Sequence, residues 1–255
     1  MLYEDVELLA RKQFMLDIGL EREGKDDLRI VLNRRHEKMP EGRRLYREEE
    51  DFFRLIVFGA DAFILSDEKL YEWSCSFYGN RKPEFMLNFH NLRQLDRELK
   101  KYGFMIEEVQ ECFLPSFIFF DRDDAVMKEE VRTELLEGET LTNLIGEGIF
   151  PHALVGRDKA IEAIGFKPSA SEGFAAAAGA QRDGAYLWQT GVDVLEEYRD
   201  RGIATELVYQ LTERLIGEGK LPFYGVRPGN IISKKVAVAA GFEPAFSEVF
   251  VKKAE

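Results

Sequence analysis

The chain has 255 residues, of which 45% are hydrophobic, and a formal net charge of −12. This length exceeds that of a typical domain of roughly 100–150 residues, so we expect two domains, and the apolar content excludes a disordered protein. The sequence contains neither a secretory signal pattern nor an apolar run of about 18 residues, so we expect a soluble, cytoplasmic protein. Cys75 and Cys112 lack metal-ligand spacing, and we expect both to be buried, reduced thiols.

The negative charge is concentrated in the first part of the chain. Residues 1–150 contain 22 Lys and Arg against 33 Asp and Glu, a net charge of −11, whereas residues 151–255 contain 13 against 14. Acidic surfaces repel phosphate backbones and anionic lipids, which argues against nucleic acid or a membrane as the partner. The charge would favour a cationic substrate or protein partner, although a solubilising surface is the simpler explanation. The sequence carries no signal for an oligomeric state.

Apolar spacing and helix caps define the elements that we predict in the first half. Gly59 interrupts a strongly apolar stretch, Asn91 is a plausible N-cap, and Gly103 is a plausible helix terminator. In chain order the predictions are an amphipathic helix over 3–18, an exposed and partly irregular connection over 20–50, a helix end and a buried strand over 52–66, a helix from Asn91 to Gly103, and a strand over 104–113.

The acidic stretch that follows Pro115 predicts a domain boundary near residue 118. After it we predict a short helix over 139–145, a hairpin of strands 160–167 and 173–181, a strand over 185–195, a helix from Ile203 to Gly217, a strand over 222–226, a helix over 231–240, and a strand over 247–253. This order predicts an α+β fold with a smaller α+β domain over 1–117 and a second domain over 118–255.

One loop lies where a predicted strand gives way to a predicted helix, in the sequence E-E-Y-R-D-R-G-I-A-T from Glu196 to Thr205. A glycine in the first turn of a helix leaves several backbone N–H groups open at the positive end of the helix dipole. Gly202 would let an anion such as a phosphate approach closely, and Thr205 can add a hydroxyl donor. The chain lacks the P-loop and G-x-G-x-x-G patterns, so another phosphate ligand is expected.

The segment Arg199-Asp200-Arg201-Gly202-Ile203-Ala204 matches the pattern [Q/R]-x-x-G-x-[G/A] and resembles the loop of the GNAT acetyltransferases. Asn230-x-x-Ser233, followed by Gly241-Phe242, resembles the second signature of that family at the expected spacing. The sequence of this region is similar to that of a little-characterised bacterial GNAT group that carries an extra N-terminal domain. The resemblance covers residues 118–255 well and the first half only loosely.

The resemblance implies a mixed central sheet with helices on both faces and acetyl-CoA as co-substrate. It implies that the strand around Val192 diverges from the next strand, and that Lys234 or Lys235 meets the 3′-phosphate. The N-terminal domain would shape the acceptor site. The cofactor-binding residues that it implies are Val192, Asp193, Val194, Arg199, Asp200, Arg201, Gly202, Ile203, Ala204, Thr205, Asn230 and Ser233.

The chain departs from the family where the chemistry is expected. Many members have a tyrosine that acts as the general acid at the position of Ala237, and some have a glutamate that acts as the general base at the position of Trp188. We therefore predict Asp193 as the base and Tyr224 as the acid, in direct transfer of an acetyl group to a primary amine of a small molecule or peptide. The acceptor, which the acidic charge would favour as a cation, is not identified.

Other interpretations of these residues stay open. A non-catalytic acyl-CoA binding module would explain the missing tyrosine and glutamate, and a phosphate-responsive interaction protein would explain the loop alone. Asn230 is equally placed as an N-cap, while Trp188 and Tyr224 could be core aromatics. The three histidines show no ligand spacing, so we predict no metal site.

Overall fold

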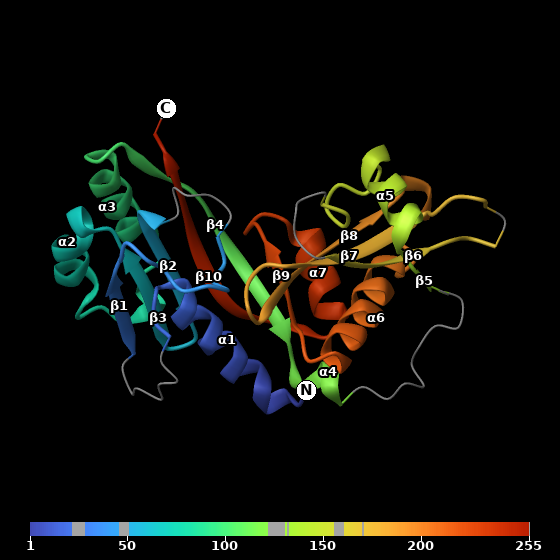
Figure 1. Ribbon diagram of the computed structural model, residues 1–255, viewed down its shortest axis with the longest axis horizontal. Coiled ribbons are helices and arrows are strands. Elements are labelled where there is room, and N and C mark those ends of the chain that lie inside the picture. Colours follow the sequence, from blue (N-terminus) through green and yellow to red (C-terminus); the bar gives the residue numbers. More distant parts are fainter. Residues whose placement is uncertain are drawn as a thin grey trace. The chain divides into compact units, whose positions relative to one another are not determined.

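The computed structural model describes residues 1–21, 29–45, 51–121, 131, 133–155, 161–169 and 171–254 (Figure 1). It divides into two compact units, each assembled from separate stretches of chain. The first unit comprises Met1–Leu9, Phe113–Gly225 and Asn230–Glu243, and the second comprises Ala10–Cys112, Val226–Gly229 and Pro244–Glu255. The domain limits 1–117 and 118–255 stay a prediction, and most of the acidic stretch behind them lies outside the described residues.

The fold is mixed α+β, as predicted. Its helices are α1 (Tyr3–Asp17), α2 (Glu68–Tyr78), α3 (Phe89–Lys100), α4 (Phe117–Phe120), α5 (Gly138–Glu147), α6 (Ile203–Gly217) and α7 (Ile231–Ala239), with short 3₁₀ turns at Pro83–Phe85 and Glu196–Tyr198. Its strands are β1 (Ile30–Arg34), β2 (Phe53–Phe58), β3 (Asp61–Ser66), β4 (Phe104–Pro115), β5 (Thr133–Leu135), β6 (Ile161–Phe166), β7 (Ala176–Arg182), β8 (Leu187–Val194), β9 (Leu221–Val226) and β10 (Phe242–Lys253).

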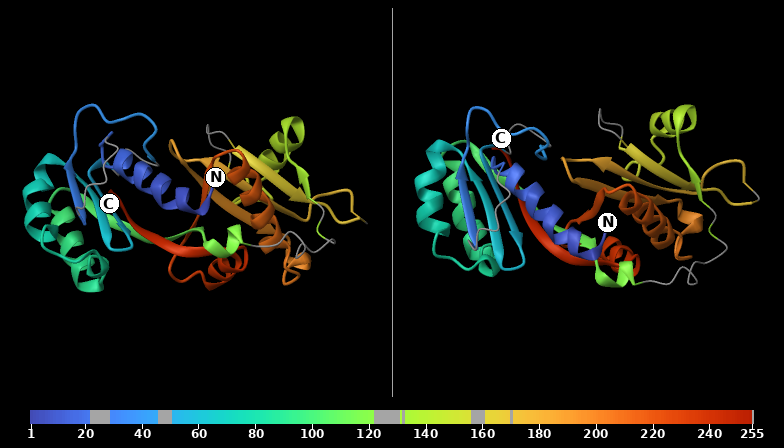
Figure 2. Two further views of the ribbon diagram at one scale, coloured as in Figure 1. Left: turned by 90° about the horizontal axis from the view of Figure 1, so that it is seen from below. Right: turned by 60° about the horizontal axis from the view of Figure 1, so that its bottom comes forward.

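The first unit contains a mixed sheet with helices on both faces. The strand order is β9-β8-β7-β6-β5, in which β8 and β9 are parallel and the other neighbours are antiparallel. Figures 1 and 2 show α5 on one face of this sheet and α6 on the other. The sheet that the sequence predicted is therefore confirmed.

Small residues along β7 let both helices approach the sheet closely. Its alanines at even positions from 176 to 180 are buried in a cluster with Leu207 and Leu211 of α6. Ala177 points to the other face and is buried in a cluster with Leu144 of α5. Because side chains alternate between the faces of a strand, a run of alanines gives two apolar faces with little bulk.

The second unit has the strand order β1-β3-β2-β10-β4. On one face of this sheet, Phe53 and Leu55 of β2 pack with Leu70 of α2 and with Leu95 and Leu99 of α3. Burial of such side chains contributes about 1.5–3 kcal/mol each to folding before the entropic cost of ordering the chain.

On the other face of the second unit lies a buried ionic cluster. Arg44 Nε is 2.6 Å from Asp17 Oδ2, Arg44 Nη1 is 3.0 Å from Glu248 Oε2, and Arg54 Nε is 3.3 Å from Glu248 Oε1. None of the four side chains is more than 3% exposed. Two cations and two anions balance, so each charge is compensated where water cannot reach it.

Three predictions for the first half were wrong. Residues 52–66 form the hairpin of β2 and β3, closed at Gly59 with φ +57°, rather than a helix and a strand. The N-cap of α3 is Asn88, whose side chain accepts from the backbone N–H of Asn91. The connection over 20–50 contains β1, which pairs with β3, and the fully buried Arg44. Helix α2 was missed altogether.

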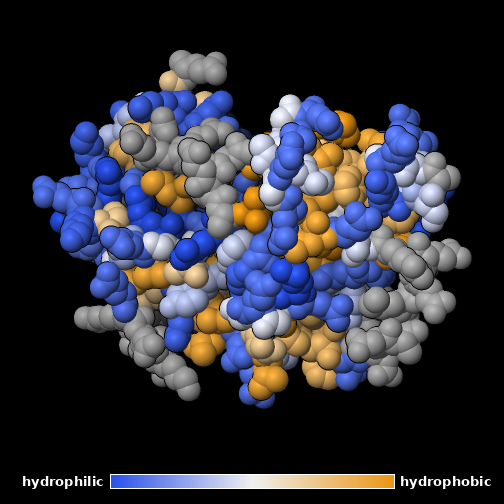
Figure 3. Space-filling view, turned by 45° about the vertical axis from the view of Figure 1, so that its right-hand side comes forward, coloured by the Kyte–Doolittle hydropathy of each residue, from blue (hydrophilic) through white to orange (hydrophobic). Residues whose placement is uncertain are grey.

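Several hydrophobic side chains are exposed on the surface. Figure 3 shows mostly hydrophilic residues with hydrophobic residues between them, and exposed examples include Phe117 and Ile118. Both cysteines are free, Cys112 buried and Cys75 half-buried. Among the helices that the structure describes, none combines the length and apolarity needed to cross a membrane.

The ionic cluster leads to a test of the fold. Glu248→Ala is expected to lower the free energy of unfolding by about 3–5 kcal/mol, because two buried guanidinium groups lose their shared counter-ion. Urea unfolding followed by circular dichroism measures this loss. The exposed Glu84 is a matched control, and Glu84→Ala should change stability by less than about 0.5 kcal/mol. Equal effects of the two substitutions would contradict the assigned role.

Candidate functional site

Strands β8 and β9 separate soon after they meet. They form three parallel residue pairs, the last of which joins Gln189 to Phe223. Beyond that pair β8 continues to Val194 and β9 to Val226 without further described pairing. The two strands therefore diverge inside one sheet, as the family resemblance implied.

The divergence leaves backbone groups of β8 without a neighbouring strand. Leu195 N–H donates to Ala175 O on the β7 side. Because peptide groups alternate in direction along a strand, those of Val192 and Val194 point to the opposite, β9 side. The side chain of Arg199 confirms this direction, since its Nε donates to Val194 O over 3.1 Å. An extended ligand could hydrogen-bond to these groups as a further strand would.

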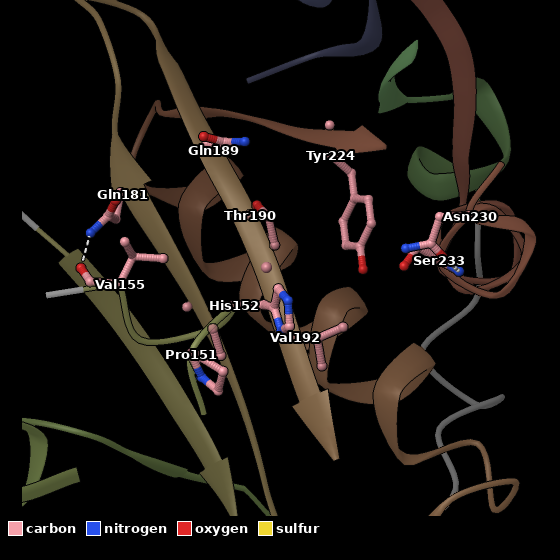
Figure 4. Close-up of a pocket in the computed structure, with 14 residues that line it drawn as sticks. Pro151, His152, Val155, Gln181, Gln189, Thr190, Val192, Tyr224, Asn230 and Ser233 are labelled. Atoms are coloured by element: carbon pink, nitrogen blue, oxygen red, sulfur yellow. Dashed lines mark hydrogen bonds between the residues drawn. The ribbon is translucent and has the colours of Figure 1, made fainter. Parts of the chain in front are cut away.

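A cavity of about 430 Å³ lies at the divergence. Figure 4 shows Gln189, Thr190 and Val192 along β8, with Tyr224 projecting from β9 and Asn230 and Ser233 beside it. The lining residues are Pro151, His152, Ala153, Val155, Gly179, Gln181, Gln189, Thr190, Gly191, Val192, Tyr224, Gly225, Asn230 and Ser233.

The hydroxyl of Tyr224 is kept protonated by its surroundings. Tyr224 is 5% exposed, and burial raises its pKa to about 12, with a smaller upward contribution from the charge of Asp193 and a hydrogen bond with Ser233 that acts in the opposite direction. A phenol with this pKa can donate a proton or a hydrogen bond at neutral pH but cannot serve as a base. Asn230 is the N-cap of α7, and its side chain accepts from Ser233 N–H over 3.1 Å.

A pair of glycines lets a loop lie directly on the sheet. Gly179 of β7 and Gly191 of β8 are opposite each other. A Cβ at Gly179 would meet Ala153 O at 2.0 Å, and a Cβ at Gly191 would meet His152 O at 2.0 Å. Real side chains do not tolerate such distances, so only glycine at these two positions lets the loop backbone come this close.

Asp193 anchors the same loop. Its Oδ2 accepts the backbone N–H groups of His152 and Ala153 at 2.7 and 2.8 Å, and its Oδ1 lies 2.7 Å from Nδ1 of the His152 ring. The Asp193 side chain is 17% exposed, whereas that of His152 is 80% exposed. The described residues that line the cavity include His152 but not Asp193.

The loop that precedes α6 presents open backbone donors. Gly202 is the N-cap of α6 with φ +79°, and no described side chain caps the helix. Asp200 also has a positive φ, +60°. The first N–H groups of a 15-residue helix are therefore available to an anion. The guanidinium group of Arg201 donates a hydrogen bond to Glu197 O.

The geometry of this part of the chain agrees with a family match. Residues 164–251 match the family described as FR47-like protein. No curated protein matches the chain.

Solved structures similar to this chain include several GNAT proteins. The GCN5-related N-acetyltransferase-like protein from Streptococcus suis is 15% identical, with 64% of this chain and 68% of that chain covered and a TM-score of 0.45. A GCN5-related N-acetyltransferase from Kribbella flavida is 15% identical, with coverages of 63% and 64% and a TM-score of 0.45. A GNAT-family acetyltransferase from Colwellia psychrerythraea is 15% identical, with coverages of 58% and 57% and a TM-score of 0.41.

The predicted site residues fall into three groups. Val192, Tyr224, Asn230 and Ser233 line the cavity, and residues 199–205 form the turn into α6 and its first residues. Asp193 and Val194 lie at the end of β8 and are not among the lining residues. Their assignments to acetyl-CoA stay predictions.

Two residues that the sequence marked as departures from the family lie in the core. Trp188 is 7% exposed with Lys220 Nζ 4.5 Å from its ring centroid, and Ala237 is fully buried. Among the described residues, no group of three or more His, Cys, Asp and Glu side chains could hold a metal ion.

Sequence reasoning missed His152, because a histidine gives no spacing signal when its partner is 41 residues away. The glycines at 179 and 191 were the available hint, since each lies inside a predicted strand, where glycine often marks a close backbone approach.

The glycine pair can be tested directly. Gly191→Ala is expected to lower the free energy of unfolding by about 1–3 kcal/mol, because its Cβ would overlap the His152 carbonyl. Gly146→Ala is the matched control: Gly146 lies inside α5 in open space, so alanine should stabilise by about 0.5–1 kcal/mol. Thermal unfolding compares the two. An unchanged or raised stability for Gly191→Ala would contradict the close approach.

Proposed function

We propose that this protein is an N-acetyltransferase that moves an acetyl group from acetyl-CoA directly to a primary amine. The divergence of β8 from β9 carries the proposal, because no strand pairs with the backbone of Val192, beside a cavity of about 430 Å³, or with the backbone N–H of Val194. An extended pantetheine arm has amide groups that can pair with such a strand. The acetyl thioester would then enter the cavity.

The turn into α6 suits the other end of acetyl-CoA. Its pyrophosphate needs several N–H donors, and the uncapped first turn of α6 offers them. The bond from Arg199 to Val194 O ties this turn to the end of β8, so a ligand along β8 would reach it. The residues present therefore fit acetyl-CoA at both ends.

The cavity offers polar groups to the reacting atoms. Thr190 Oγ1 is buried and has no hydrogen-bond partner among the described residues, although Thr190 lines the cavity. Leaving a buried hydroxyl unpaired costs about 1–3 kcal/mol, which a bound ligand would recover. The protonated Tyr224 hydroxyl belongs to a residue that lines the cavity, and it would give its proton to the leaving thiolate, the role that Ala237 cannot fill.

Turnover separates the enzyme from a binding module. Purified protein with acetyl-CoA and a panel of primary amines, including polyamines, aminoglycosides and amino acids, should release free thiol in an amine-dependent manner. Binding of acetyl-CoA without thiol release for any amine would favour the non-catalytic module. Tight binding of ATP with no preference for acetyl-CoA would contradict both.

The turn into α6 generates a prediction about charge. Gly202→Asp is expected to abolish acetyl-CoA binding in a calorimetric titration, because a carboxylate would stand where a pyrophosphate is proposed. Gly202→Asn is the matched control, since Asn and Asp tolerate the positive φ of this position comparably. Gly202→Asn should weaken binding much less, and an equal loss in both variants would show that backbone strain, not charge, is responsible.

Tyr224 generates a prediction about rate and pH. Tyr224→Phe should lower kcat by about 100-fold, the usual contribution of a positioned general acid. Because the pKa of Tyr224 is raised to about 12, the group stays protonated at ordinary assay pH, so the loss should be uniform from about pH 6 to pH 10. Tyr102→Phe, in the second unit, should leave kcat unchanged. A Tyr224→Phe variant with normal kcat would remove the acid assignment.

A further inference from the structure

We infer that His152 takes the proton from the substrate amine and that Asp193 positions it for this step. The inference rests on the proposed function and deepens it, because it names the group that makes the amine nucleophilic. Primary amines are mostly ammonium ions at neutral pH and must lose a proton before they can attack a thioester.

The hydrogen bonds around His152 decide which ring nitrogen is available. Asp193 Oδ1 lies 2.7 Å from Nδ1, and a carboxylate can only accept a hydrogen bond. Nδ1 therefore carries the hydrogen, and in the neutral ring Nε2 keeps the lone pair. No described residue hydrogen-bonds to Nε2. The ring is thus held in the tautomer that a base requires.

The backbone of His152 is held as firmly as its ring. Asp193 Oδ2 accepts from the N–H groups of His152 and Ala153, and the glycines at 179 and 191 let this loop rest on the sheet. One carboxylate thus fixes both the loop and the imidazole. Three hydrogen bonds occupy Asp193, which favours a positioning role over direct attack on the substrate proton.

Few groups of the cavity could perform this step. Among the described lining residues the titratable side chains are His152 and Tyr224. Tyr224 cannot accept a proton at neutral pH, because burial raises its pKa to about 12. His152 lines the same cavity, and with a side chain 80% exposed it can pass the proton on to water.

The reaction balances without any oxidant or metal. An ammonium N–H bond breaks and its proton goes to Nε2 of His152, which later releases it to solvent. The freed lone pair forms the C–N bond to the acetyl carbon, and the C–S bond breaks. The thiolate gains a proton from Tyr224, which recovers one from the nitrogen as the amide forms. The products are the amide, the free thiol and one proton.

The test measures kcat/KM for the best primary amine across the pH range. His152→Gln should lower kcat/KM by about 100-fold near pH 7, and the loss should shrink as pH rises, because solution then supplies neutral amine. Acetyl-CoA affinity, measured by calorimetry, should not change. His90→Gln, an exposed histidine on α3, is the control and should match the wild type.

A double-mutant cycle tests the role of Asp193. If Asp193 acts through His152, Asp193→Asn should lower kcat/KM in the wild type but add almost nothing to His152→Gln. Because Asp193→Asn removes a loop anchor, its circular dichroism and thermal midpoint are measured alongside. His152→Ala with added imidazole provides a second readout, since an external base should restore part of the rate.

The outcomes separate this inference from the proposed function. Amine-dependent thiol release with a normal rate and pH profile in His152→Gln would overturn the role of His152 and leave the acetyltransferase intact. Absence of thiol release in the wild type with every amine would overturn the proposed function, and the role of His152 with it. A pH-dependent loss in His152→Gln together with imidazole rescue of His152→Ala would support both.

Discussion

The early end of the β8–β9 ladder is the constraint on which the site depends. Both strands are needed in the sheet of the first unit, yet they pair through only three residue pairs. A strand whose peptide groups point into a cavity carries a standing cost unless a ligand or water pairs with them. The proposed function follows from that cost, since an extended thioester arm is a ligand that could satisfy Val192 and Val194 in the way a missing strand would.

The first unit supports this opening from both faces. On one face the alanines of β7 let α6 pack closely, which fixes the helix N-terminus near the end of β8 through Arg199. On the other face two glycines admit the loop that bears His152, and Asp193 ties that loop down. Small residues in central strands therefore bring the N-terminus of α6 close to the end of β8, and they let the loop that bears His152 rest on the sheet beside the cavity. The proposed chemistry depends on the missing pairing between β8 and β9 as much as on the side chains of the sheet.

Much of the second half could be predicted from the sequence. The hairpin of β6 and β7, the strand β8 and the helices α6 and α7 follow from apolar periodicity and glycine punctuation, and the loop around Gly202 follows from its motif. The first half was harder, because local signals there were weak or misleading. Gly59 is compatible with either a helix end or a hairpin. Arg44 has the sequence context of a surface residue, and only the tertiary fold brings Glu248 next to it. His152 and Asp193 are likewise joined only by the tertiary fold.

Amide hydrogen exchange, measured by NMR with and without acetyl-CoA, tests the central claim most directly. The amides of Val192 and Val194 face the open side of β8, whereas those of Gly191 and Asp193 face β7. Acetyl-CoA should slow exchange at Val192 and Val194 while leaving Gly191 and Asp193 unchanged, and ATP and NAD should have no such effect. Acetyl-CoA that binds without protecting Val192 and Val194 would contradict the account, because the ligand would then not pair with the open strand.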